Sequence, residues 1–344
     1  MTRTVAYGHV MDTPRTQRNG RFADLQTRLL HSERNRLCVH AGNRRDYTFL
    51  CRQTAAGRIV RPYPGMFART ERWEATESDE RQRIIARTLQ QRHPTWTFAG
   101  ITAACLWRLD HSRYLDRRAP IVIAAVGHDV GMGSRGRLQR CYLPSRDIEQ
   151  VEIRDGVRVT GITRTLFDCG RRYDFRDAMP FFDAAIRDGH ITRDALLAAY
   201  DEPRLGLHQE KPMRLAQHAN GLSENGGESF CYATMVESGV MLPRQQVEFV
   251  HPDDSRRRLR VDFLWELAGD VSIVAEFDGM RKYVDPEMTG GRVGGEVVAD
   301  ERARQDMLQR CGVNRIVRLT FDEVLKRGPM VGKLLEAGVP MIGA

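Results

Sequence analysis

Near the N-terminus, apolar positions first follow a helical period and then a strand period. Residues 22–30 (FADLQTRLL) and 45–53 (RDYTFLCRQ) have helical spacing, and residues 58–73 alternate around a turn at Pro64-Gly65. Two helices followed by a two-stranded wing are typical of a small winged helix-turn-helix. We therefore predict a winged helix-like DNA-binding module at 21–75, after a disordered tail at 1–20.

Helical spacing dominates the middle region, residues 76–225. Residues 119–126 (APIVIAAV) indicate one short buried strand, and the glycine-rich segment 127–136 lacks the spacing of a dinucleotide site, so it is predicted to be a turn. The polar stretch 201–227 predicts a domain boundary near residue 225. Helices are predicted at 78–93, 98–109, 163–173, 175–191 and 192–200.

The last part of the chain, residues 226–344, mixes both periods. The strand segments alternate apolar and polar residues, which favours a sheet, and the helical segments flank them in sequence. A mixed sheet flanked by helices makes the whole chain an α+β or α/β multidomain protein. The predicted order is helix 228–240, strands 245–250, 258–266 and 270–278, helix 299–312 and strand 315–320.

Three carboxylates lie in the most apolar hairpin of this part. If its turn is the three-residue loop 268–270, Asp262 falls opposite Glu276, with Cβ atoms about 4.5 to 5.5 Å apart and Asp278 diagonal to the pair. Carboxylates this close repel one another and call for a divalent cation or an arginine between them. The two alternatives are a magnesium site and a salt-bridged face, with partners Arg260, Arg281 or Arg304.

The strand period also predicts faces for these residues. Glu276 and Asp278 share a face with Val274, and Asp262 shares one with Leu264. The opposite face of the earlier strand is predicted to carry Val261, Phe263 and Trp265.

Composition favours a nucleic-acid partner. The net charge is +8, and the excess comes mainly from arginine, which forms bidentate contacts with phosphate and guanine. A GC-rich genome would also enrich arginine. Around the second predicted helix, a DNA-binding face and a solvated basic face are both open for Arg44, Arg45, Arg52, Arg58 and Arg61.

Cysteine and histidine positions favour neither a metal nor a disulfide framework. The seven cysteines are scattered without a CxxC pair, and the histidines are dispersed. This usage fits a reducing cytoplasm, and no apolar run is long enough to cross a bilayer. We expect a cytoplasmic location and no membrane partner.

The C-terminal part resembles the very short patch repair endonucleases of the PD-(D/E)XK superfamily. The matching residues are Glu228, Pro243, Gln246, VDF at 261–263, AEFDG at 275–279, Lys282-Tyr283, ERARQDMLQRCG at 301–312 and VNRIVRLT at 313–320. The resemblance implies a restriction-endonuclease-like fold and a Mg²⁺ or Mn²⁺ ion held by Asp262 and Glu276. It also implies that Glu228 and Gln246 support the site.

In the same resemblance, Asp278 stands where the family usually has a lysine. Lys282 would then supply the missing positive charge, and Arg304 and Arg318 would contact the phosphate backbone.

The upstream part resembles actinobacterial proteins of the AbiE antitoxin-like type. The similarity lies in PGMF at 64–67 and in Thr163, Arg164, Thr165, Leu166 and Asp168. It implies an N-terminal winged helix. In the segment TAACLWRL, Arg108 replaces the glycine that is usual after the helix.

The leading hypothesis is a metal-dependent endonuclease that hydrolyses DNA phosphodiesters. The alternative is a transcriptional regulator or antitoxin-like protein with a non-catalytic nuclease-like domain, and a third is a domain that binds a toxin or defence-system partner. The acidic pair Asp262 and Glu276 favours the first, because a scaffold has no use for self-repelling carboxylates. The missing lysine favours the second.

Overall fold

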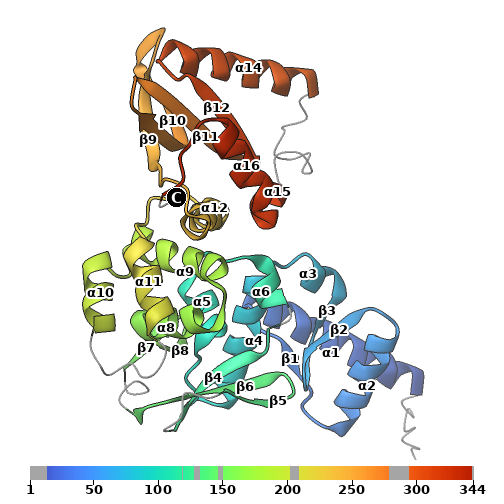
Figure 1. Cartoon of the computed structure of the whole chain (residues 1–344). Coiled ribbons are helices and arrows are strands. Elements are labelled where there is room, and N and C mark those ends of the chain that lie inside the picture. Colours follow the sequence, from blue (N-terminus) through green and yellow to red (C-terminus); the bar gives the residue numbers. More distant parts are fainter. Residues whose placement is uncertain are drawn as a thin grey trace, which may run out of the picture.

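The structure is a computed structural model that describes residues 14–117, 119–127, 132–145, 150–201, 209–278 and 294–342. It mixes helices with several small sheets, and α12 lies between the lower, N-terminal parts and the upper, C-terminal sheet (Figure 1).

The N-terminal elements surround a small apolar core. Their sheet is antiparallel in the order β1-β3-β2, and its core contains Leu29, Leu50 and Phe67. The predicted second helix and hairpin are confirmed, and β1 adds a strand that the sequence did not predict. The bounds are α1 (Pro14–Arg34), β1 (Val39–His40), α2 (Arg44–Ala55), β2 (Ile59–Tyr63), β3 (Met66–Arg69) and α3 (Thr70–Glu74).

The first helix corrects the predicted tail. Because α1 begins at Pro14, residues 14–20 are helical, whereas the prediction extended the tail to residue 20. Residues 1–13 lie outside the described part of the chain.

The middle region contains more strands than predicted. The strand at Ile121–Val126 is confirmed as β4, but it pairs in parallel with β6, which pairs with β5. Part of the predicted glycine turn, Met132–Arg135, is the strand β5. The additional strands are β5, β6 (Leu138–Leu143), β7 (Val151–Arg154) and β8 (Val157–Thr160).

The long helices of the middle region are confirmed, and their apolar faces form its core. Two helices, α6 and α11, were not predicted. The segment of α11 is mostly polar, although its Leu215 and Ala216 are fully buried. The helices are α4 (Ser78–Arg92), α5 (Gly100–Trp107), α6 (Arg113–Arg117), α8 (Ile162–Arg172), α9 (Phe175–Arg187), α10 (Arg193–Asp201) and α11 (Glu210–His218).

Arg108 takes the backbone conformation that glycine usually takes. It ends α5 in the left-handed region, with φ 63° and ψ 30°. A residue with a Cβ atom is strained there. The turn after α5 therefore carries backbone strain that a glycine would not have.

The C-terminal sheet has the strand order β12-β11-β10-β9. Strands β9, β10 and β11 are antiparallel, and β12 joins β11 in parallel, as expected for a mixed sheet. The helices α15 and α16 were not predicted. The elements are α12 (Gly226–Ser238), β9 (Arg244–His251), β10 (Asp254–Leu267), β11 (Val271–Asp278), α14 (Gly294–Arg310), β12 (Arg315–Thr320), α15 (Phe321–Lys326) and α16 (Gly328–Glu336).

Helix α12 is shared between two cores. Eight consecutive residues, Glu228 to Met235, are buried, so both sides of the helix are covered. Ala233 packs in the core of the middle region, whereas Phe230 and Met235 pack in the core under the sheet. The predicted boundary near residue 225 thus coincides with the start of a helix that belongs to both sides.

Asp183 of α9 fastens this junction. Its carboxylate is fully buried and accepts hydrogen bonds from the backbone N–H groups of Asn220 and Gly221, at 2.9 and 3.1 Å. It also accepts bonds from the hydroxyls of Ser223 and Ser229, at 3.3 and 2.6 Å. Arg187 of α9 also donates to the carbonyl oxygens of Ser223 and Glu224, at 3.3 and 3.1 Å, so two side chains of α9 hold the segment that enters α12.

Candidate functional site

The carboxylate hairpin has the predicted register. The turn is the loop 268–270, and the pairs run from Leu267↔Val271 to Phe263↔Ala275, which sets Asp262 across from Glu276. The paired ladder ends there, and Asp262 Oδ2 instead accepts a hydrogen bond of 2.8 Å from the backbone N–H of Phe277.

The strand alternation breaks at Asp262, which corrects the predicted faces. Val261 packs with Leu264 in the apolar cluster that includes Leu308 of α14, whereas Phe263 and Trp265 pack on the side of α12. The prediction had placed Val261 with Phe263 and Trp265. It failed because β10 is not regular where it passes Gln246 of β9.

Gln246 is the source of this irregularity. Its φ is 51°, a left-handed value that strains a residue within a strand. The neighbouring pairs Val261↔Val247 and Phe263↔Gln245 are present, but residues 262 and 246 between them do not pair. In this conformation the Gln246 amide donates to Glu228 Oε2 at 2.9 Å and to Asp262 Oδ1 at 3.4 Å.

Glu228 lies buried in the first turn of α12. Its carboxylate accepts hydrogen bonds from the backbone N–H of Glu224 at 2.8 Å and from the Asn225 amide at 2.5 Å. Burial raises the pKa of Glu228 to about 7, and the charge of Asp262 adds to the shift, while the bond from Glu224 opposes it. The Glu228 carboxyl therefore holds a proton for part of the time at neutral pH.

Gly227 lets α12 begin directly against β11. A Cβ atom at this position would lie 2.5 Å from Cε1 of Phe277. The close approach brings Glu228 into the same cluster as Asp262.

Glu276 and Asp278 each have an arginine partner. Arg304 of α14 donates from Nε and Nη2 to Glu276 Oε1, at 2.9 and 2.7 Å. Arg318 of β12 lies 3.7 Å from Asp278 Oδ2, and Asp278 is buried. The salt-bridged alternative is thus present at Glu276, with Arg304 as partner, whereas Arg260 pairs with Glu224.

The acidic cluster consists of Glu228, Asp262, Glu276 and Asp278, and carboxylate oxygens are ligands that magnesium accepts. Among the described residues, no three of the four acidic side chains bring ligand oxygens within 4.8 Å of one another. Magnesium, however, commonly uses one or two carboxylates and completes its shell with water and phosphate oxygens. Asp262 and Glu276 offer oxygen donors of the type that magnesium prefers, and Glu276 is paired with Arg304 in this structure. Arg281, Lys282 and Tyr283 lie outside the described residues.

The five predicted DNA-binding arginines are all exposed. Arg44, Arg45 and Arg52 lie on α2, and Leu50 of the same helix is buried in the core. Arg61 lies on β2, with its guanidinium 5.5 Å from the centre of the Tyr47 ring. The module therefore presents Arg44, Arg45, Arg52, Arg58 and Arg61 on its surface.

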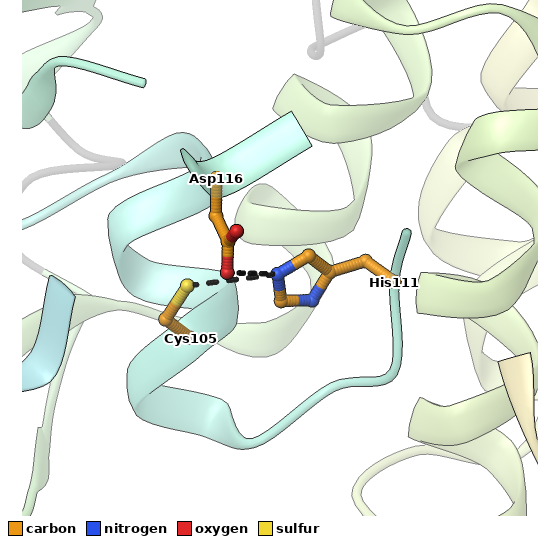
Figure 2. A group of neighbouring side chains, drawn as sticks. All are labelled: Cys105, His111 and Asp116. Atoms are coloured by element: carbon orange, nitrogen blue, oxygen red, sulfur yellow. Dashed lines mark hydrogen bonds and ion pairs between the residues drawn. The ribbon is translucent and has the colours of Figure 1, made fainter. Parts of the chain in front are cut away.

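Sequence reasoning missed one group. Cys105 of α5, His111 of the following loop and Asp116 of α6 converge in the core of the middle region (Figure 2). His111 Nε2 lies 3.9 Å from Cys105 Sγ and 3.0 Å from Asp116 Oδ2. A search for CxxC pairs could not find this group; the signal was a cysteine, a histidine and an aspartate within twelve residues.

In the described part of the chain, no helix is both long and apolar enough to cross a membrane. Comparison of the chain with family models, with curated proteins and with solved structures gives no match.

Proposed function

We propose that the chain is a cytoplasmic DNA-binding protein whose C-terminal domain is a restriction-endonuclease-like, metal-dependent endonuclease. The observation that carries the proposal is the bridge made by Gln246. This residue adopts a strained backbone conformation, and its amide joins the carboxylates of Glu228 and Asp262, which come from different elements.

Strain and like charges at one place favour a functional role. Backbone strain persists where the surroundings hold it, and it gathers at catalytic and binding sites. Burying Glu228 beside Asp262 opposes folding, because both groups are acidic. Backbone strain and buried neighbouring carboxylates both destabilise the fold, so a catalytic or binding role explains this cluster better than a role in stability.

The proposed roles follow from the contacts. Asp262 and Glu276 would hold a Mg²⁺ or Mn²⁺ ion, which when bound polarises the phosphodiester and favours attack by water. Gln246 orients Asp262, and Glu228 holds Gln246 and a proton at its carboxyl. Arg304 and Arg318 lie beside the carboxylates, where they can contact phosphate oxygens. Asp278 and, from sequence alone, Lys282 complete the proposed set.

The N-terminal module would bind the duplex as a winged helix. Its exposed arginines neutralise phosphates without sequence preference, and α2 is the element proposed for the major groove. This binding would bring the DNA backbone to the C-terminal domain.

One contact favours the alternative, a regulator or antitoxin-like protein without catalysis. The Arg304 guanidinium binds Glu276 through two nitrogens, so a cation of the chain itself neutralises a proposed metal ligand. Asp278 in place of the family's lysine points the same way. A toxin or defence-system partner would then bind the domain as protein.

Cleavage of supercoiled plasmid in Mg²⁺ or Mn²⁺ tests the proposal. We expect the wild type to cut, Asp262→Ala to lose cutting, and Gln246→Ala to lose about 10- to 100-fold through misplacement of its partners. Glu266→Gln is the matched control, since Glu266 lies in the same strand but is exposed and pairs with Arg244. Circular dichroism and a melting curve check that each variant folds.

The outcome decides between the two classes. Metal-dependent cutting that Asp262→Ala abolishes and Glu266→Gln retains supports the endonuclease. If the folded wild type binds DNA but does not cut it, the endonuclease proposal is contradicted and the regulator hypothesis is supported.

A further inference from the structure

Cys105, His111 and Asp116 have the side-chain chemistry of a zinc site. Their ligand atoms all lie within 4.8 Å of one another. In tetrahedral zinc sites, bonds of about 2.0 to 2.3 Å place neighbouring ligand atoms about 3.3 to 3.6 Å apart. The observed separations of 3.9 Å for Sγ to Nε2 and 3.0 Å for Nε2 to Oδ2 lie on either side of that range. Small side-chain rotations would bring them into it.

His111 is held in the orientation that a metal ligand needs. Its Nδ1 lies 2.8 Å from the carbonyl oxygen of Leu109, which can only accept, so Nδ1 carries a hydrogen. The ring also stacks on Phe181, with centroids 5.2 Å apart. Metal-binding histidines typically donate their other N–H to a carbonyl in this way, which directs Nε2 to the ion. Here Nε2 is directed between Cys105 and Asp116 (Figure 2).

Asp116 gives a second, independent observation. Its side chain is 1% exposed, and Oδ1 is buried without a hydrogen-bond partner among the described residues. A buried carboxylate oxygen without a partner is destabilising. A cation between the three side chains would lie beside this carboxylate.

A simple ion pair explains only part of the group. Burial opposes the positive charge on His111, but its acidic neighbours Cys105 and Asp116 outweigh burial and raise the pKa of His111 well above its ordinary value. An imidazolium paired with Asp116 would account for these two residues. The same ring N–H also faces Cys105 Sγ, 3.9 Å away, but the ion pair leaves Asp116 Oδ1 without a partner among the described residues.

We propose that Cys105, His111 and Asp116 bind one Zn²⁺ ion that fixes the loop between α5 and α6. A thiolate, an imidazole and a carboxylate suit zinc, whereas magnesium prefers oxygen ligands alone. Binding removes the thiol proton of Cys105 and a ring proton of His111, both released to solvent. Water takes the fourth position. This site is separate from the acidic cluster of β10 and β11.

Cobalt substitution of the full chain, purified without a histidine tag, tests the proposal. After chelator treatment, we expect one Co²⁺ or Zn²⁺ per chain at this site, with a thiolate-to-cobalt absorption band. Cys105→Ser should abolish the band, and the isosteric Asp116→Asn should weaken binding at least about tenfold. Cys38→Ser is the control, because Cys38 is buried in the same core but lies outside the group.

The sulfur band distinguishes this site from the acidic cluster, where cobalt would bind oxygen alone. A folded chain that gives no sulfur band overturns the proposal, and so does a band that survives Cys105→Ser. If Cys105→Ser fails to fold, the affinity of Asp116→Asn decides: unchanged affinity overturns the proposal, and weakened affinity supports it.

Discussion

Glu228 links the acidic cluster to the stability of the fold. Its pKa is raised from 4.5 to about 7 in the folded chain, so the folded state binds this proton more tightly than the unfolded state. Below pH 4.5 both states are protonated and the burial costs little. As pH rises from 4.5 to 7, the unfolded state ionises first, and folding loses up to about 3 kcal/mol.

We therefore expect Glu228→Gln to flatten the pH dependence of stability between pH 5 and 8. Urea unfolding in EDTA measures the free energy at both ends of this window for wild type and variant. The comparison uses the difference between the two pH values, because glutamine also changes hydrogen bonds to Glu224 and Asn225. The control Glu248→Gln, at an exposed position of β9, should keep the wild-type difference. An unchanged difference in Glu228→Gln would contradict the shifted pKa.

At the residue scale, the sequence predicted the hairpin but not the bridge within it. The assumed three-residue loop placed Asp262 opposite Glu276, and a shift of one residue would have turned every side chain of the strand to the other face. The left-handed conformation of Gln246 has no sequence signal, since glutamine rarely adopts it. The same holds for the choice of Arg304 as the partner of Glu276, because Arg260 and Arg281 were equally open.

At the scale of elements, Asp183 joins α9 to the start of α12. Asp183→Ala leaves two partly buried backbone N–H groups and two buried hydroxyls without this acceptor. We expect it to lower the free energy of unfolding by about 3 kcal/mol, since groups bonded to a buried charge are costly to abandon. Chemical denaturation measures the loss. Asp188→Ala, at the exposed end of the same helix, should cost well under 1 kcal/mol; equal losses would refute the role of Asp183.

Element length decided what the pattern could predict. Long helices such as α4 and α9 show several turns of apolar spacing, and the strands of the hairpin alternate clearly. The strands β5 (MGSR) and β6 (LQRCYL) contain no β-branched residue, and β7 (VEIR) and β8 (VRVT) alternate but hold only four residues each, too few for a clear pattern. Helix α15 did have a sequence signal, the capping box of Thr320 and Glu323, which went unused.

At the scale of the whole molecule, the net charge of +8 favours binding to the DNA phosphates. The double variant Arg44→Ala, Arg52→Ala should weaken duplex binding and reduce the slope of log affinity against log salt by about two, one for each lost phosphate contact. The control is Arg310→Ala, Lys326→Ala, which removes the same charge from exposed ion pairs elsewhere. Fluorescence anisotropy at several salt concentrations measures both. If both double variants weaken DNA binding equally, the arginines of α2 act only through the net charge of the protein and not through direct phosphate contacts.

Because α12 packs in two cores, the middle region and the C-terminal part cannot be separated or exchanged without exposing buried residues. The composition change at residue 225 looks like a natural cutting point, yet a fragment 226–344 would uncover the side of α12 that carries Ala233. The other fragment would lose the hydroxyl of Ser229 from Asp183. Because Glu228 lies on this same helix, exchange of the C-terminal part between proteins would have to carry a matching α9 surface to preserve the acidic cluster.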